Sequence, residues 1–344
     1  MMMTSPRGNC SSGRRPSLRP YNTFHMDYSA ECIVPLTSVE QLRCADWSRR
    51  HVVLGAGSNT VPVADFDGVV YLMRIRGRRL LRSADDDAHF VDVSAYAGES
   101  WSELVEWTLR EGAPGLENLA GIPGTVGAAP IQNVGAYGSD LAQFCLRVDA
   151  FNKRTRLLER FWNADCQFGY RTSAFKSRLR DSHVLVAVTL RLPKPWKAQL
   201  NHWTLSSAAQ PVSPRSIFLT ITERRAKVLP NPERLGNSGS FFVNPLVAIE
   251  QFQRLRSQFP DVPGYVTGGV AKVPAAWLIA KAGLKGYGVG GARVHTEHAL
   301  ILVNSGSATG PQLLELVEHI RQRIRDLFLV ELEVEVNLLD KLGF

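Results

Sequence analysis

One segment, from Gly115 to Gly138, limits what this chain can fold into more than any other. It contains six glycines and two prolines, and Glu117 is its only charged residue. Glycine is unfavourable inside helices and proline interrupts both helices and strands, so the segment is expected to form an extended loop. The backbone N–H groups of such a loop can hold phosphate oxygens without a cation. Composition alone leaves a second interpretation open, a glycine-rich surface loop that binds nothing.

The surrounding residues exclude two common nucleotide-binding loops. No Gly-Lys-Ser/Thr follows, as a Walker A loop requires, and the strand–GxGxxG–helix order of a Rossmann fingerprint is absent. A second glycine loop occurs earlier, where the apolar run His51–Leu54 predicts a strand that enters Gly55-Ala56-Gly57-Ser58-Asn59. A strand that ends in this way can turn sharply and direct N–H groups and a hydroxyl at a phosphate. The pattern gains weight because the chain has two such loops.

The length of 344 residues predicts two or three domains, and the formal net charge of +8 fits a polyanionic ligand such as a dinucleotide or a nucleotide sugar. Nucleic acid is disfavoured, because the basic residues are scattered and are not interleaved with aromatic residues as in a stacking platform. No apolar run approaches the roughly 20 residues of a membrane span, so no membrane association is expected. We also expect a monomer.

The cysteine and histidine patterns predict neither a disulfide framework nor a metal site. The five cysteines form an odd set without a CxxC motif, which favours a reducing cytoplasm. His295 and His298 form an isolated HxxH without carboxylate or cysteine partners at ligand spacing, so no metal is expected. The cysteines are Cys10, Cys32, Cys44, Cys145 and Cys166.

The central segment also carries a family resemblance. Its sequence ENLAGIPGTVGAAPIQNVGAYG resembles the flavin-binding signature of the type I UDP-N-acetylenolpyruvoylglucosamine reductases, also called UDP-N-acetylmuramate dehydrogenases. The similarity extends from about Tyr21 to Val336. It implies an FAD-containing oxidoreductase of peptidoglycan synthesis, and thus of cell-wall biogenesis, cell shape and division. With NADPH as hydride donor, such an enzyme reduces UDP-N-acetylglucosamine enolpyruvate to UDP-N-acetylmuramate.

The resemblance places FAD on both glycine loops. The residues that it assigns to the cofactor are Gly55, Gly57, Ser58, Asn59, Ile122, Pro123, Gly124, Gly127, Ala128, Gln132, Asn133, Gly135 and Ala136.

Three further motifs supply the implied catalytic residues. FGYRTSAFK resembles the motif that binds the substrate carboxylate, through Arg171, and GNSGSFFVNP resembles the motif whose serine, Ser240, donates a proton. In the run Val330–Val336, alternation predicts a strand with three glutamates on one face, and the pattern alone selects none of them. The family signature Leu-Glu-Pro-Glu-Val places its second glutamate at Glu335.

The substrate-binding set shows three departures from the family pattern. Type I members carry Tyr-Gly-Asp-Leu after the long apolar strand, and this tyrosine folds over the bound nucleotide sugar. Here His202 stands at the tyrosine position. Either His202 or Trp203 takes the place of the tyrosine, or this contact with the substrate is lost. Val243 replaces a common lysine, and Lys227 lies one residue further from the Leu-Pro that follows it. The substrate contacts implied by the resemblance are Tyr137, Tyr170, His202, Lys227, Asn244 and His298.

These residues suit the reduction of an enolpyruvyl ether. Addition of hydride to the alkene builds negative charge on the enolpyruvyl carboxylate, which Arg171 can bind bidentately and a protonated Glu335 can stabilise by a hydrogen bond. Ser240 would then protonate the neighbouring carbon.

The expected fold class is α+β. The resemblance implies a two-lobed flavin domain of the PCMH/vanillyl-alcohol-oxidase type and a C-terminal α+β substrate-binding domain. The implied bounds are a disordered basic tail at 1–20, lobe one at 21–80 rejoined by 310–344, lobe two at 81–218, and the substrate domain at 219–309. Periodicity and capping predict strands at 68–74, 89–97, 144–151, 155–159, 183–192 and 330–336, and helices at 100–110, 213–227, 249–259, 274–282 and 310–327.

Parts of the sequence also allow two other functions. One is another flavin oxidoreductase of the same fold, which often attaches its flavin to a histidine or cysteine, but neither residue occurs in the two glycine loops. The other is a flavin- or nucleotide-sugar-binding relative with impaired catalysis, motivated by the three departures. The joint presence of Arg171, Ser240 and Glu335 argues against it.

Overall fold

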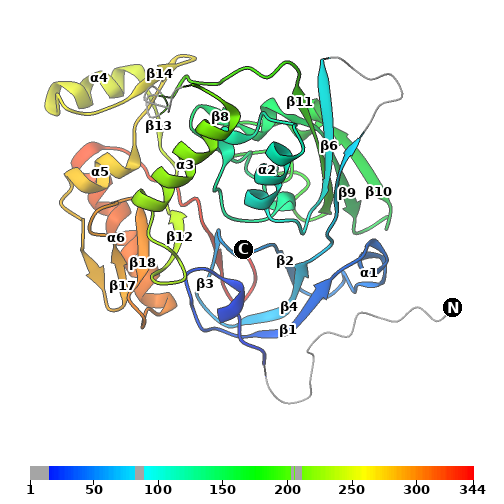
Figure 1. Cartoon of the computed structure of the whole chain (residues 1–344). Coiled ribbons are helices and arrows are strands. Elements are labelled where there is room, and N and C mark those ends of the chain that lie inside the picture. Colours follow the sequence, from blue (N-terminus) through cyan, green and yellow to red (C-terminus); the bar gives the residue numbers. More distant parts are fainter. Residues whose placement is uncertain (1–14, 82–88, 203–204, 206–210) are drawn as a thin grey trace. The chain divides into compact units, whose positions relative to one another are not determined.

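The structure is a computed structural model and describes residues 15–81, 89–202, 205 and 211–344 (Figure 1). The chain forms two compact units, each described by itself below. Unit 1 comprises residues 32–56 and 68–227, and unit 2 comprises residues 15–31, 57–67 and 228–344. The finer division into two flavin lobes and a substrate domain stays a prediction. Within the predicted tail, Arg15 Nη1 lies 2.8 Å from Asp67 Oδ1 and Ser17 forms a β-bridge with Ser29.

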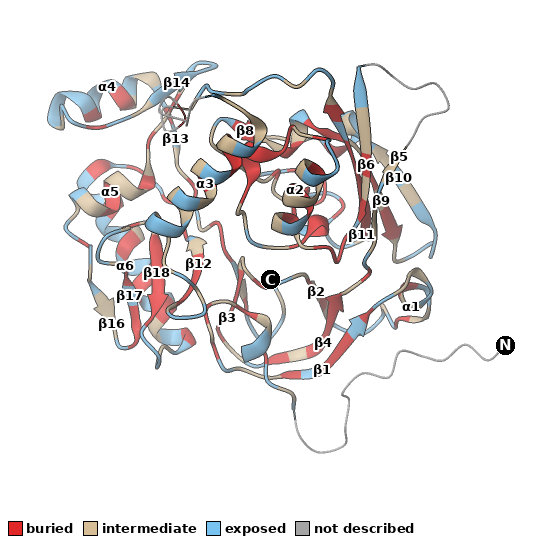
Figure 2. Ribbon diagram, in the orientation of Figure 1, coloured by how far each residue is buried: buried red, intermediate tan, exposed pale blue. Residues whose placement is uncertain are grey.

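The main sheet of unit 1 is five-stranded and antiparallel. Its strands are β5 (Arg78–Leu81), β6 (Phe90–Tyr96), β9 (Cys145–Asn152), β10 (Leu158–Trp162) and β11 (His183–Pro193), in the order β10-β9-β11-β6-β5. The central strand β11 is buried over most of its length, as its near-continuous apolar run predicts (Figure 2). The predicted hairpin is confirmed, but its second strand starts at Leu158 because residues 153–155 form the turn.

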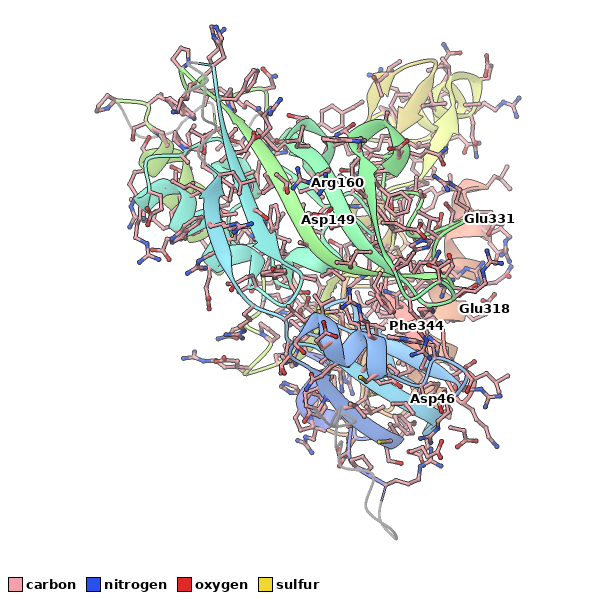
Figure 3. All side chains as sticks on the ribbon, turned by 90° about the vertical axis from the view of Figure 1, so that its right-hand side faces the viewer. Asp46, Asp149, Arg160, Glu318, Glu331 and Phe344 are labelled. Carbon is pink, nitrogen blue, oxygen red and sulfur yellow. The ribbon has the colours of Figure 1, made fainter. Side chains whose placement is uncertain are left out.

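The edge of this sheet faces solvent with charged side chains. Arg160 of β10 lies opposite Asp149 of β9, and its Nε donates to Asp149 Oδ1 at 3.1 Å. Figure 3 shows the two side chains close together on these neighbouring strands. Such an exposed pair contributes little to stability, so the sheet depends on its buried face.

Helix α2 (Trp101–Arg110) packs its apolar face into unit 1. Its start is set as predicted, since the Ser100 side chain accepts the N–H of Glu103 at 3.3 Å. Trp101 is almost completely buried, and its Nε1 donates to Leu119 O at 3.0 Å. The predicted helix at 213–227 is confirmed as α3 (Pro214–Val228).

A smaller three-stranded sheet lies mostly in unit 1. It has the order β1-β4-β2, and β2 runs parallel to β4. The elements are β1 (Ala30–Leu36), α1 (Val39–Cys44), β2 (His51–Leu54) and β4 (Phe66–Met73). Strand β2 delivers the chain to the first glycine loop, as predicted.

Unit 2 contains two small antiparallel sheets, one parallel strand pair and three helices. The first sheet has the order β12-β18-β17-β16, and the second β13-β15-β14. The elements are β3 (Thr60–Pro62), β12 (Gly236–Ser240), β13 (Leu246–Ala248), α4 (Ile249–Gln258), β14 (Tyr265–Thr267), β15 (Val270–Lys272), α5 (Ala275–Lys281), β16 (Gly288–Val289), β17 (Ala292–Val294), β18 (Ile301–Asn304), α6 (Gly310–Phe328) and β19 (Asn337–Leu339), which pairs with β3.

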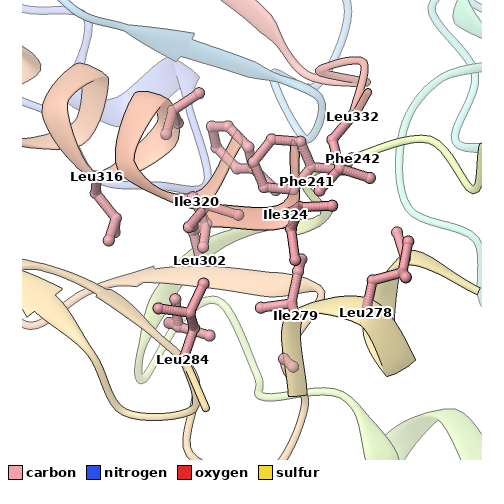
Figure 4. Close-up of a cluster of buried hydrophobic side chains, with 14 of the residues drawn as sticks. Phe241, Phe242, Leu278, Ile279, Leu284, Leu302, Leu316, Ile320, Ile324 and Leu332 are labelled. Atoms are coloured by element: carbon pink, nitrogen blue, oxygen red, sulfur yellow. The ribbon is translucent and has the colours of Figure 1, made fainter. Parts of the chain in front are cut away.

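The core of unit 2 forms around α6. Leu316, Ile320 and Ile324 lie on one face of this helix at helical spacing and are buried. They belong to the same buried cluster as Phe241 and Phe242, which directly follow β12 (Figure 4). The cluster therefore fixes the segment that carries Ser240.

The predicted strand from Val330 to Val336 is wrong. Of these residues, all of which the structure describes, only Val334 forms a β-bridge, to Phe242. The segment changes partner within a few residues, because Glu335 N bonds to Phe241 O and Asn337 N bonds to Asn59 O. A regular ladder consequently begins only at β19.

The cysteines differ from expectation at one position. Cys44, Cys145 and Cys166 are free thiols, as predicted. Cys32, however, is disulfide-bonded, contrary to the expectation from the odd count, and Cys10 lies outside the described residues.

Candidate flavin and substrate site

The two glycine loops approach each other within unit 1. A Cβ added to Gly55 would lie 2.4 Å from Thr125 Oγ1, so only glycine fits at this contact. Arg74 fixes the first loop, since its Nη1 donates to Gly55 O at 3.0 Å. Gly127 of the second loop donates its N–H to Ala97 O at 3.0 Å, and a Cβ there would lie 2.5 Å from the Ala97 Cβ. The backbone of each loop therefore packs directly against its neighbour, Thr125 for the first loop and Ala97 for the second.

The first loop continues into unit 2, because the division between the units falls after Ala56. Gly57 has a φ of +70°, and a Cβ there would lie 1.9 Å from Tyr21 O. Asn59 Nδ2 donates to Glu335 O at 3.2 Å. The turn at Gly57 thus requires a residue without a side chain, and the side chain of Asn59 ties the first glycine loop to the backbone of Glu335.

The central segment contains no long helix or strand, as predicted. Its regular parts are two 3-10 helices, η2 (Glu117–Leu119) and η3 (Val126–Ala128), and the two-residue strand β7 (Gly135–Ala136), which pairs with β8 (Ser139–Asp140) just beyond the segment. Asn133 and Tyr137 have positive φ values of 47° and 49°. Non-glycine residues persist in this conformation only where the surroundings impose it, and they gather at functional sites.

Two buried polar residues hold the central segment in place. Glu117 accepts the N–H of Gly115 at 2.7 Å and also bonds to Nε1 of Trp196. Asn118 Nδ2 donates to Tyr137 O and to Gln199 O, each at 2.9 Å. The only charged residue of the segment is therefore engaged in maintaining the loop.

Arg171 lies in a tight turn of unit 1. Gly169 and Thr172 exchange backbone hydrogen bonds at 3.0 and 3.4 Å, and Arg171 between them has a φ of 55°. Lys176 Nζ donates to Arg171 O at 3.2 Å. The neighbouring Tyr170, a predicted substrate contact, is 40% exposed.

Unit 2 brings Ser240 and Glu335 onto adjacent segments. Glu335 N donates to Phe241 O at 2.9 Å, directly beside Ser240, the exposed last residue of β12. Glu335 is only 9% exposed, whereas Glu331 and Glu333 are exposed. The structure thus distinguishes the glutamate that alternation could not select.

A cluster of unit 1 gathers around Tyr137. The rings of Tyr137 and His202 meet edge to face with centroids 5.4 Å apart. Arg225 was not predicted, yet its Nε donates to Gly121 O at 2.9 Å and its guanidinium bonds to the Tyr137 side chain. Burial lowers the pKa of Arg225, and Tyr137 opposes this shift. Arg225 belongs to the Arg-Arg-Ala-Lys run at 224–227, and nothing in that run indicates which of its two arginines contacts the central segment.

The remaining predicted substrate residues belong to both units. Lys227 is exposed near the end of α3, and Trp203 lies outside the described residues. Asn244 Oδ1 accepts the N–H of Ala275 at 2.9 Å, so Asn244 caps α5. The rings of His298 and His295 stack with centroids 5.4 Å apart.

The described residues also bear on a metal site and a membrane span. In the described part of the chain no group of three or more His, Cys, Asp or Glu residues is arranged to hold a metal ion. Likewise, no helix among the described residues is long and apolar enough to cross a membrane.

Comparison with known proteins decides the family. Residues 231–339 match the model of the C-terminal domain of UDP-N-acetylenolpyruvoylglucosamine reductase, and residues 36–159 match an FAD binding domain. The chain is 44% identical over 334 residues to the reductase of that name from Shewanella sp. strain ANA-3, covering 95% of this chain and 97% of the relative. It is 45% identical over 331 residues to the one from Burkholderia ambifaria strain MC40-6, covering 92% and 94%.

The chain belongs to the UDP-N-acetylenolpyruvoylglucosamine reductase family. The family resemblance inferred from the sequence is thereby confirmed, together with an FAD-dependent oxidoreductase activity. The predicted fold class is also confirmed: the crystal structure of the reductase from Thermus caldophilus superposes with a TM-score of 0.65 at 24% identity, covering 94% of this chain and 98% of that one.

The reductase family's cofactor fits the residues present. Gly55 and Gly127 lie where a side chain would collide with Thr125 and Ala97, so both glycine loops pack closely against the protein within residues 36–159, the part that matches an FAD binding domain. The matched FAD domain spans both glycine loops. Family membership also decides against the alternative of another flavin oxidoreductase of the same fold.

Proposed function

We propose that this chain catalyses the NADPH-dependent reduction of UDP-N-acetylglucosamine enolpyruvate to UDP-N-acetylmuramate, a step in peptidoglycan precursor synthesis, with FAD as its bound cofactor. The observation that carries the proposal is the 44% identity over 95% of the chain to a reductase of this name. We further propose that the enzyme is a cytoplasmic monomer. Light scattering of the purified protein tests the monomeric state.

The proposed residue roles follow from the chemistry of the reaction. When bound, FAD supplies to the alkene the hydride that it takes from NADPH. Arg171 binds the enolpyruvyl carboxylate through two N–H groups, and the protonated carboxyl group of Glu335 donates a hydrogen bond to the charge that develops there. Ser240 gives its hydroxyl proton to the neighbouring carbon. The adjacency of Ser240 and the Glu335 segment in unit 2 supports the last two roles.

The visible spectrum of the purified protein tests this function. Under anaerobic conditions the flavin band should bleach on addition of NADPH and return when UDP-N-acetylglucosamine enolpyruvate is added. A band that bleaches but does not return would favour the impaired relative, which is motivated by His202, Val243 and the displaced Lys227. Absence of a flavin band after addition of FAD would contradict the assignment of both glycine loops.

Substitution of Ser240 tests the proton donor. Ser240→Ala should retain flavin reduction by NADPH and should slow the substrate-dependent step by about 100-fold or more, the usual contribution of a general acid. Ser238→Ala is the matched control, since the buried Ser238 hydroxyl lies on the same strand and has no hydrogen-bond partner in the described structure. Stopped-flow spectroscopy of the two half-reactions measures both variants. If Ser240→Ala retained both half-reactions, the proton-donor role would be wrong.

A further inference from the structure

Two side chains connect the glycine-rich segment to the turn that carries Arg171. Ser173 Oγ donates to Ile131 O at 2.7 Å, and Asn133 Nδ2 donates to Gly169 O at 3.1 Å. Ser173 is 2% exposed and Asn133 is 6% exposed. Both donor side chains are therefore buried, and neither can lose its partner without cost.

The hydrogen-bonding capacity of these two side chains is engaged within the protein. Asn133 Oδ1 accepts the N–H of Ala142 at 2.9 Å, and Ser173 Oγ accepts the N–H of Phe175 at 3.1 Å. The serine has one O–H to donate, and it goes to Ile131. The Asn133 side chain thus forms a structural bond at each end of its amide, and the cofactor contact expected of Asn133 stays a prediction.

Backbone conformation points to the same connection. Arg171 has a φ of 55°, a left-handed conformation that such a side chain holds only when the surroundings enforce it, and Asn133, a residue type that adopts this conformation readily, has a φ of 47°. The paired bonds between Gly169 and Thr172 enforce the turn itself, and the bonds from Ser173 and Asn133 fix that turn to residues 131–133. Gln132, an expected FAD contact, lies between the two attachment points.

We propose that Ser173 and Asn133 are positioning residues for Arg171, which fix the carboxylate-binding arginine to the same loop that holds the flavin. The inference rests on the proposed function. The reacting alkene must lie between the hydride donor and the group that binds its carboxylate, and a displacement of about 1 Å can cost on the order of 100-fold in rate. A shared loop keeps the two at a constant separation.

Stopped-flow measurement of the separate half-reactions tests the proposal. Ser173→Ala should retain bound FAD and its reduction by NADPH to within about twofold, and should slow reoxidation by the enolpyruvyl substrate by about tenfold or more. Ser177→Ala is the matched control, because Ser177 Oγ donates to Ser173 O at 2.9 Å within its own segment and does not reach the loop.

A double-mutant cycle separates positioning from general stability. If Ser173 acts through Arg171, Ser173→Ala should change the rate of substrate-dependent reoxidation by less than about twofold in an Arg171→Gln background. An equal loss in both backgrounds, or a parallel loss of bound FAD, would overturn the proposal. Wild-type protein that binds FAD and accepts hydride but does not reduce the substrate would instead refute the proposed function, so the two failures are distinguishable.

Discussion

At the residue scale, His295 closes the turn that presents His298, a proposed substrate contact. Its Nδ1 accepts the N–H groups of Glu297 and His298, each at 3.2 Å. An acceptor nitrogen carries no proton, so the turn requires the neutral ring. Burial lowers the pKa of His295, and the nearby His298 lowers it further while Glu297 opposes both.

This geometry predicts a loss of stability in acid. The His295 pKa is near 6.5 in the unfolded chain and lower in the native state. As the pH falls below about 6.5 the unfolded state binds the proton first, so the free energy of unfolding should decrease; well above that pH both states are neutral and His295 has no effect. His295→Asn should reduce this dependence, since an asparagine oxygen can accept the same N–H groups without titrating. Thermal unfolding between pH 5 and 8 checks it, and identical profiles for both proteins would contradict it.

At this scale the sequence predicts which positions need a particular residue type better than it predicts which contacts each side chain makes. A sharp turn at Gly57 was predicted, and the structure shows why that turn needs glycine: a Cβ would lie 1.9 Å from Tyr21 O. The engagement of Asn133 and the inward turn of Arg225 could not be predicted, because each depends on a carbonyl partner distant in sequence. Backbone acceptors leave no trace in residue identity, so no pattern of side chains reveals them.

At the scale of single elements, α6 begins with a capping box. The Thr309 side chain accepts the N–H of Gln312, and the Gln312 side chain accepts the N–H of Thr309 at 3.1 Å. Thr309→Ala should lower the free energy of unfolding by about 1 kcal/mol, the usual value for loss of such a cap. Urea denaturation followed by circular dichroism measures it. An unchanged midpoint would mean that packing against the unit 2 core alone sets the start of the helix.

Elements with a strong local signal were predicted well. The cap at Ser100 and the apolar spacing that follows it correctly gave α2, and the apolar run at 183–192 gave β11. The run at 330–336 alternates as regularly as any strand, yet it forms a single bridge. Its bonds to Phe241 and Val243 surround that bridge, and the next bond, from Asn337, already goes to Asn59. Alternation describes which side chains face the core and does not determine whether a partner strand is present.

For the whole molecule, the formal net charge of +8 should attract the anionic substrates NADPH and UDP-N-acetylglucosamine enolpyruvate. Salt screens such attraction over about 10 Å at 0.1 M ionic strength, so kcat/KM should decrease as sodium chloride is added. Steady-state kinetics over a salt series measures this effect. Reoxidation of the reduced flavin by dioxygen, which carries no charge, is the control. A kcat/KM that is independent of salt would show that the net charge plays no part in substrate capture.

The pairing of β3 with β19 has a consequence for how the protein is made. Strand β3 (Thr60–Pro62) cannot pair until β19 (Asn337–Leu339) has been synthesised, which happens only after most of the chain has left the ribosome. At about 5–20 residues per second this interval is on the order of tens of seconds. Unit 2 therefore cannot complete its fold during early translation. The segments 15–31 and 57–67 can contact each other early, through bonds such as Phe66 N to Ser29 O, but they lack their partners in 228–344 until that part has been synthesised. The surface that those partners cover stays exposed to chaperones and proteases in the meantime.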